Sequence, residues 1–219
     1  HKAQFNHVES QKTYNIAMTD VAHLVLLPQI SAYLEEHAPL VQLNVHSIKS
    51  QSLALLKNGT LDLIVGYYEQ LDDYFYQQKL FEQYFVVIAA KDHPRLKHPQ
   101  ITLDEYLAEK HIDVEVGAGH FSFERHIRQM GYQRNKVMTL PSYLGVGLVV
   151  QQSDAIATVP FYLSEVLLAR GNLQILELPQ DFPTYAIKQF WYISNHNQKS
   201  HQWIRQVFYE NLKNLNTQR

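Results

Sequence analysis

Hydroxyl, imidazole and aromatic side chains stand beside the short apolar runs of the sequence, where they could hold a small ligand. Thr19 and Asp20 come directly after IAM, and His46 and Ser47 come after NV. The other candidates are Gly66, Tyr67, His120, Phe121, Ser142, Tyr143 and Thr158. Hydroxyl groups can donate hydrogen bonds to a carboxylate or a phenol oxygen, and aromatic faces can pack against a ring. The set therefore favours a small aromatic acid or phenol as the ligand.

Structural roles can also explain some of these residues. Asp20 precedes an amphipathic run, so it can be a helix cap, and a cap beside a ligand site still leaves the hydroxyl of Thr19 free. No lysine or arginine stands among the candidates. An anionic ligand would take its countercharge from helix dipoles or from His46 and His120. Each histidine alone is more often structural or exposed, and the chain contains 12 of them.

Other kinds of chemistry find little support in the sequence. Two groups of histidines could suggest a metal but lack the H-E-x-x-H spacing: His120 with Glu124 and His126, and His93 with His98. Gly145 and Gly147 fall inside a predicted helix, and no G-x-S-x-G or P-loop motif is present. We therefore expect no metal, no cofactor and no enzymatic activity.

Strands and helices alternate along the chain. The predicted strands are 13–18, 41–45, 61–65, 83–90, 112–116, 136–140, 155–159, 173–177 and 185–194. The predicted helices are 22–36, 51–58, a short one opened by the capping box of Thr102 and Glu105, 121–130, 142–151, 161–169 and a last one capped by Ser200. This order is typical of parallel sheets, in which ligands bind outside the carboxyl ends of the strands. Thr19 would stand at the first such end.

Composition limits the class of protein. The chain has 219 residues, of which 46% are hydrophobic, so it can bury a large core. Its 19 Lys plus Arg and 21 Asp plus Glu give a formal charge of -2, and we expect the chain alone not to bind duplex DNA. It contains no cysteine, which fits a reducing cytoplasm. No apolar stretch approaches the ~18 residues of a membrane helix, and no signal peptide is seen.

The order of several segments resembles one known family. These segments are IAMTD, LLPQISAYLEEHAP, LKNGTLDLIVG, LFEQYFVVIAAKDHP, the spacing from Ile101 to Ile112, and SDAIATVP. Together they cover essentially Tyr14 to Leu212 and resemble the effector-binding domain of LysR-type transcriptional regulators. The IAMTD and TVP segments are most similar to regulators of aromatic-compound metabolism and nodulation.

The resemblance implies an α/β fold of the type 2 periplasmic-binding-protein kind, with two α/β subdomains joined by two crossover strands. Residues 13–90 plus 191–219 would form subdomain I, residues 91–190 subdomain II, and residues 1–12 a remnant of a linker. The effector would bind in the cleft between the lobes. The resemblance also implies a homodimer or tetramer, in which the helix at 22–36 meets the helix at 161–169 of a partner.

The implied function is ligand sensing. A small effector, which the candidate residues predict to be aromatic, would control DNA binding and transcription through an N-terminal winged helix-turn-helix that this sequence does not contain. The regulator would be cytoplasmic. The alternative is a periplasmic solute-binding protein of a transporter, which has the same fold. The motif resemblance and the lack of an export signal favour the regulator.

Overall fold

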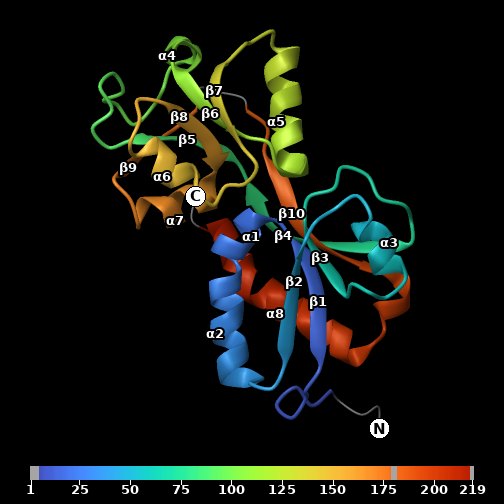
Figure 1. Ribbon diagram of the computed structural model, residues 1–219. Helices are drawn as coiled ribbons and strands as arrows, with labels where there is room; N and C mark the ends of the chain where they lie inside the picture. The colour runs from blue at the N-terminus through green and yellow to red at the C-terminus, as the bar shows by residue number, and fades with distance from the viewer. Residues whose placement is uncertain (1–4, 179–181, 218–219) are drawn as a thin grey trace. The chain divides into compact units, whose positions relative to one another are not determined.

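The computed structural model describes residues 5–178 and 182–217, and these form two compact units. Unit 1 comprises the chain up to residue 82 and from residue 186 onwards, and unit 2 comprises residues 83–185. The chain leaves unit 1 at the end of β4 and returns at the start of β10 (Figure 1). No helix in the described ranges is long and apolar enough to cross a membrane.

Unit 1 is built on a mixed sheet. Its strands are β1 (Thr13–Met18), β2 (Gln42–Ser47), β3 (Leu63–Gly66), β4 (Phe75–Gln83) and β10 (Tyr185–Tyr192). They lie in the order β2-β1-β3-β10-β4, with β1 parallel to both β2 and β3, and β10 antiparallel to β3. All four residues of β3 are buried, as expected of a parallel strand that is covered on both faces.

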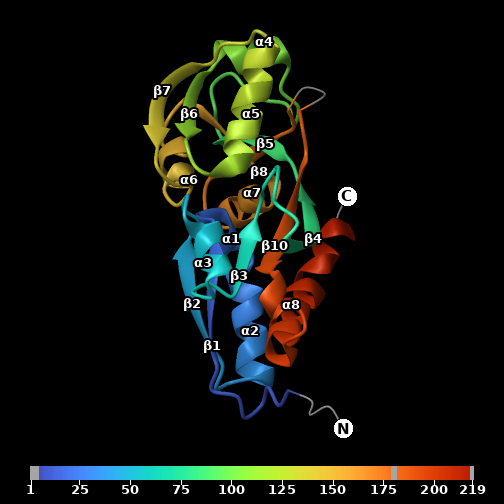
Figure 2. The same cartoon turned by 90° about the vertical axis from the view of Figure 1, so that its right-hand side faces the viewer.

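Helices cover both faces of this sheet, α3 on one and α2 and α8 on the other (Figure 2). The helical segments are α1 (Asp20–Val25), α2 (Leu27–His37), α3 (Ser52–Lys57), α8 (Lys199–Leu212) and the short 3-10 turns η1 (Ile193–Asn195) and η2 (Lys213–Thr217). On the α3 side, Leu56 packs with Ala17, Ile64 and Phe190 of the sheet. The core of unit 1 therefore lies directly against the strands.

Unit 2 has a second mixed sheet. Its strands are β5 (Phe85–Ala90), β6 (Lys110–Val114), β7 (Asn135–Leu140), β8 (Ile156–Pro160) and β9 (Leu173–Leu176), in the order β7-β6-β8-β5-β9. β6 is parallel to β7 and β8, whereas β5 is antiparallel to β8 and β9. β5, which the sequence-based division placed in the first lobe, thus pairs with strands of unit 2.

The helices of unit 2 are α4 (Leu103–Ala108), α5 (Gly117–Gln129), α6 (Val146–Val150) and α7 (Phe161–Leu168). Tyr106 of α4 and Phe123 and Ile127 of α5 join Phe85 and Ile156 in the core on one face of the sheet. The predicted capping box at the start of α4 is confirmed, because Thr102 and Glu105 hydrogen bond each other's backbone N–H groups.

Several predicted boundaries were wrong for local reasons. The helix predicted over 22–36 is broken at Leu26 into α1 and α2, with Pro28 in the first turn of α2, where its missing N–H costs nothing. Ser200 is not a cap, because α8 already begins at Lys199. β4 was not predicted, since it is an edge strand whose outer residues are polar and show no apolar run.

Two buried histidines fix helices to their sheets as neutral rings. His201 of α8 accepts a hydrogen bond from Arg205 Nη1 at Nδ1 (2.8 Å), so its Nε2–H donates to the carbonyl of Asp62 (2.7 Å). His111 Nε2 lies 2.7 Å from the carbonyl oxygen of Tyr106. Burial lowers the pKa of each imidazole to about 4. Both rings are therefore uncharged in the folded protein at neutral pH.

These histidines predict a loss of stability in mild acid. Below a pH of about 6.5 the unfolded chain takes up protons on both rings and the folded protein does not until about pH 4, so the free energy of unfolding falls over this window. We expect a loss of up to ~2 kcal/mol per histidine between pH 7.5 and pH 5, measured by urea unfolding. Equal stability at the two pH values would contradict the prediction.

Candidate functional site

The predicted ligand residues of unit 1 lie at one edge of its sheet. β1, β2 and β3 run in parallel, and their register aligns Met18 with Ser47 and with Val65. Thr19 and Tyr67 therefore follow the ends of β1 and β3, and Ser47 is the last residue of β2, all at the same edge. The structure brings these three positions together within unit 1, as predicted for the carboxyl ends of parallel strands.

Thr19, rather than Asp20, is the cap of α1. The Thr19 hydroxyl oxygen accepts a hydrogen bond from the N–H of Ala22 (3.2 Å), and Asp20 is the first helical residue. A hydroxyl that accepts one hydrogen bond still has its own hydrogen to donate. The cap and a contact with a ligand oxygen are therefore compatible.

Two other positions of unit 1 have local roles. His46 Nε2 lies 3.2 Å from Asn15 Oδ1, so its ring is directed across the neighbouring strand β1. Gly66, the last residue of β3, is closely packed, because a Cβ atom there would lie 2.8 Å from Cδ1 of Ile48. Glycine lets the backbone at the end of β3 approach the loop after β2.

Unit 2 presents an open helix terminus at the carboxyl edge of β6. α5 begins at Gly117, whose φ of 79° favours glycine, and the N-cap residue Val116 has no side chain that could cap the first N–H groups. Phe121 on this helix is 60% exposed, an unusual exposure for phenylalanine. Ser142 follows β7 and accepts a hydrogen bond from the N–H of Leu144, while Tyr143 is buried. Amide groups, a hydroxyl and an aromatic face thus lie at this edge of unit 2.

α5 packs very closely on its neighbours. A Cβ atom at the buried Gly119 would lie 2.9 Å from Cζ of Tyr185. Because the predicted helix began only at Phe121, the sequence did not reveal this contact. The two glycines weaken the helical pattern at its start, yet one supplies the turn and the other the close approach.

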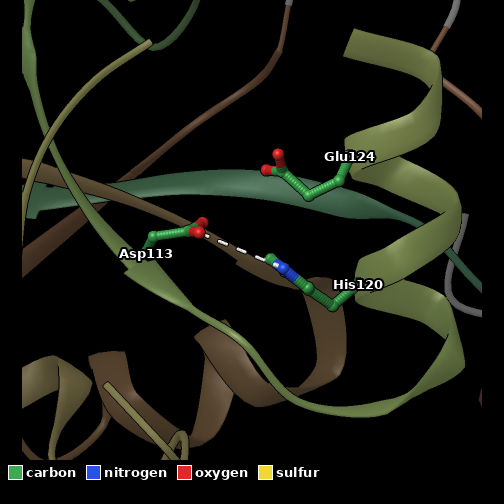
Figure 3. Close-up of side chains that lie close together, drawn as sticks. All are labelled: Asp113, His120 and Glu124. Carbon is green, nitrogen blue, oxygen red and sulfur yellow. Dashed lines mark ion pairs between the residues drawn. The ribbon is translucent and has the colours of Figure 1, made fainter. Parts of the chain in front are cut away.

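His120 and Thr158 point into the interior of unit 2. His120 of α5 and Asp113 of β6 face each other, with Nε2 and Oδ2 4.0 Å apart, and Glu124 lies one turn further along the helix (Figure 3). The Thr158 hydroxyl lies 2.8 Å from the Tyr106 hydroxyl. Burial lowers the pKa of His120, against the pull of the Asp113 charge, so the ring is neutral at pH 7.

Two cations complete this buried group. Arg134 donates to Asp113 Oδ1 (3.0 Å) and contacts Glu124, and Lys136 Nζ lies 2.7 Å from Asp113 Oδ2 and 3.1 Å from Glu124 Oε2. Burial alone would raise the pKa of the Asp113 carboxyl, but Lys136 and Arg134 hold it below its usual value. Sequence reasoning missed Asp113, although a carboxylate inside the apolar strand HIDV signals a buried partner.

Asp113, His120 and Glu124 also have the atom types of a metal site. One possible ligand atom from each lies within 4.8 Å of the others. Their carboxylate oxygens, however, already contact Arg134 and Lys136. A divalent ion would have to displace the ammonium group and share the site with a guanidinium, so the electrostatics disfavour a metal here.

Comparison with known proteins places the chain in a family. Its sequence matches the LysR substrate binding domain over residues 7–213. The chain belongs to this family. The domain is 29% identical over 214 residues to the HTH-type transcriptional activator NahR of Pseudomonas putida, covering 96% of the chain and 70% of NahR. It is 24% identical to nodulation protein D 1 of Sinorhizobium fredii, covering 98% of the chain and 67% of that protein.

Solved structures agree with this assignment. A probable transcriptional regulator, PA0477 from Pseudomonas aeruginosa, is 27% identical with a TM-score of 0.83, over 94% of this chain and 68% of that one. The effector-binding domain of QuiR in complex with shikimate has a TM-score of 0.74 at 16% identity, over 93% and 98% of the two chains, and shows the fold alone. The predicted fold class and the effector-binding domain of a LysR-type regulator are confirmed, and the solute-binding alternative is excluded.

The close packing of α5 predicts the effect of a single methyl group. Gly119→Ala places a Cβ atom against Tyr185 and should lower the free energy of unfolding by ~1–3 kcal/mol, which exceeds the gain in helix propensity. Gly145→Ala is the matched control, because no atom lies within 4 Å of the added Cβ, and it should change stability by less than ~0.5 kcal/mol. Urea unfolding of both variants makes the comparison; equal stability would contradict the packing argument.

Proposed function

We propose that this domain binds a small aromatic acid or phenol through the groups at the carboxyl edges of its parallel strands, and thereby controls transcription by its regulator. The observation that carries the proposal is the pairing of the uncapped start of α5 with the exposed ring of Phe121. Free N–H groups at a helix start attract an anion, and an exposed ring offers a face for stacking. A carboxylate attached to a ring satisfies both.

The other groups at these edges fit the same chemistry. Ser142 in unit 2 and Thr19 in unit 1 each use their hydroxyl oxygen as an acceptor and can still donate to an anionic or phenolic oxygen. Tyr67, Tyr143, Asp20, Ser47 and Gly66 flank these positions in their own units. QuiR, a neighbour in fold, holds shikimate, which is a small cyclic carboxylic acid. We assign the domain a sensory role without a catalytic step and place its regulator in the cytoplasm.

Effector binding can be measured by calorimetry against a panel of benzoates, salicylates and phenols. Ser142→Ala should weaken binding by about 10-fold or more, since a hydrogen bond to a charged group is worth ~1.5–3 kcal/mol, and Phe121→Ala by about 5-fold, since stacking is worth ~1 kcal/mol. Tyr74→Ala is the control. Tyr74 is an exposed aromatic residue that directly precedes β4 in unit 1, and its loss should leave affinity unchanged. Unchanged affinity in both site variants would contradict the proposed site, and no binding by the whole panel would contradict the aromatic ligand.

The pH dependence separates two roles for His120. Because the pKa of His120 is lowered, its ring is already mostly neutral at pH 7, and affinity for a benzoate should be nearly equal at pH 7 and pH 8. If the ring were instead protonated in contact with the ligand, affinity would fall as the pH rises above ~7. The same titrations, repeated at both pH values on the wild-type chain, decide between the two.

We further propose that two copies of the domain pair through exposed apolar surfaces. In unit 1, α2 and the edge strand β2 border a groove of about 510 Å³, lined by Leu27, Ser31, Leu34, Glu35, Ala38, Pro39, Val41, Leu43 and Val45. In unit 2, the edge strand β7 and the segment of α6 expose Val137, Met138, Leu144 and Leu148. Such surfaces on a globular domain mark interaction sites, and an isologous pair buries each of them twice.

This pairing uses a different helix of unit 2 from the one that the resemblance suggested. α7, within the predicted face at 161–169, exposes one large apolar side chain, Leu168, in the described part of the chain. We choose α6 and β7 because they expose more large apolar side chains than α7 does. The predicted pairing role of the helix at 22–36 is retained, because α2 lies within that range.

Sedimentation velocity at micromolar concentration tests the pairing. The wild-type chain should sediment as a species of twice 25.6 kDa, and Leu148→Glu should shift it to the monomer because the glutamate places a charge in the interface. Leu168→Glu on α7 is the control and should remain dimeric. A wild-type chain found only at 25.6 kDa would contradict the proposal.

A further inference from the structure

A closed group of charged side chains holds α5 against β6 and β7 in unit 2. Asp113 comes from β6, and His120 and Glu124 come from successive turns of α5 (Figure 3). Arg134 directly precedes β7, and Lys136 lies near the start of β7, where it pairs with β6. Both side chains of the Arg134–Asp113 pair are almost completely buried, at 2% and 4% exposure. The Arg134–Asp113 pair therefore lies under α5, and Lys136 reaches it from the surface with a side chain that is 32% exposed.

The charges of this group balance. Asp113 and Glu124 supply two negative charges, Arg134 and Lys136 two positive ones, and His120 is neutral. Each carboxylate contacts both cations. Removing one member would leave an unpaired buried charge, which costs more than the pair contributes. Such a network favours one position of the helix that carries two of its members.

The network continues from Arg134 towards α4 and β8 through uncharged groups. Arg134 also reaches the hydroxyl of Tyr106 on α4, and that hydroxyl meets Thr158 of β8. His120 and Thr158 thus belong to the same buried polar network, at its two ends. Phe121, the residue after His120, is exposed on the same turn of α5.

We propose that this network is a latch that fixes the start of α5, and that His120 and Thr158 are positioning residues of the effector site that act through it. The positioning role of His120 and Thr158 rests on the effector site proposed above, whereas the latch does not. The latch sets where the free N–H groups of α5 and the ring of Phe121 stand. His120 and Thr158 then contribute to effector binding without touching the effector.

Hydrogen exchange in the absence of effector tests the latch directly. Lys136→Met removes one cation from a side chain that is 32% exposed, so the substitution is compatible with folding. The amides of residues 121–127, whose hydrogen bonds hold α5 together, should exchange about 10-fold faster in this variant. Lys110→Met is the matched control, because Lys110 pairs with the exposed Asp154 (3.3 Å) elsewhere in unit 2, and exchange in α5 should not change.

A second variant keeps the test independent of one substitution. Thr158→Val removes the hydroxyl at the far end of the network with little change in shape, and it should raise exchange in α5 by a few-fold. Equal exchange of α5 in the wild type, Lys136→Met and Thr158→Val would overturn the latch. Because no effector is needed, this result does not depend on whether the aromatic panel binds.

Effector binding then separates positioning from contact. Thr158→Val and His120→Gln should, like Lys136→Met, weaken binding of the best benzoate or phenol and speed exchange in α5, whereas Phe121→Ala should weaken binding and leave exchange unchanged. If Thr158→Val and His120→Gln alter exchange but not affinity, the positioning role is overturned.

A zinc titration tests whether Asp113, His120 and Glu124 bind a metal ion instead. The thermal midpoint of the EDTA-treated wild-type chain should not rise with ZnCl₂, because Lys136 and Arg134 occupy the carboxylates. A zinc-dependent rise that is lost in His120→Gln would show a metal site at Asp113, His120 and Glu124 and would overturn the latch.

Discussion

The parallel pairing of three strands in each unit is the constraint on which the other features depend. In unit 1 the trio is β2, β1 and β3, and in unit 2 it is β7, β6 and β8. Parallel strands need a crossover between them, which supplies the helices, and all their carboxyl ends fall at one edge. Loops and helix starts that follow those ends carry the hydroxyl, amide and aromatic groups. The antiparallel strands β5 and β10 extend the sheets without changing which edge this is.

Buried polar groups fix the position of a helix in each unit, and they make that position sensitive to the loss of any one partner. In unit 1, His201 is held between Arg205 and the carbonyl of Asp62, and in unit 2 Asp113 is held between two cations. A buried polar group without partners is costly, so each such network favours the arrangement that pairs its charges, although Arg134 Nε has no hydrogen-bond acceptor among the described residues. That arrangement fixes α8 on its sheet in unit 1 and α5 on its sheet in unit 2.

The carboxyl edges of the two sheets carry polar and aromatic groups, whereas the cores are apolar, and membership of the LysR substrate-binding family fits this difference. The solved regulator PA0477 has the same fold at 27% identity, with a TM-score of 0.83, so the packed frame tolerates wide change in sequence. Ligand choice depends instead on a few groups at the edges, since fold alone does not determine function. In this chain the groups that we propose for this role are hydroxyls, amides and rings, without a lysine or arginine among the predicted ligand residues.

The sequence by itself determined the alternation of strands and helices, because apolar runs and turn residues report burial along each segment, and its resemblance to one family implied the two-subdomain fold class. It also placed Thr19, Ser47, Tyr67 and Ser142 at strand ends, where the structure has them. It could not show that His120 and Thr158 turn inward while Phe121 turns outward. Their directions depend on a helix that starts at Gly117, on the ring of Tyr185 and on charges contributed by β6 and β7. Those partners are distant in sequence, so only tertiary packing brought them together and decided which side chains remain available to a ligand.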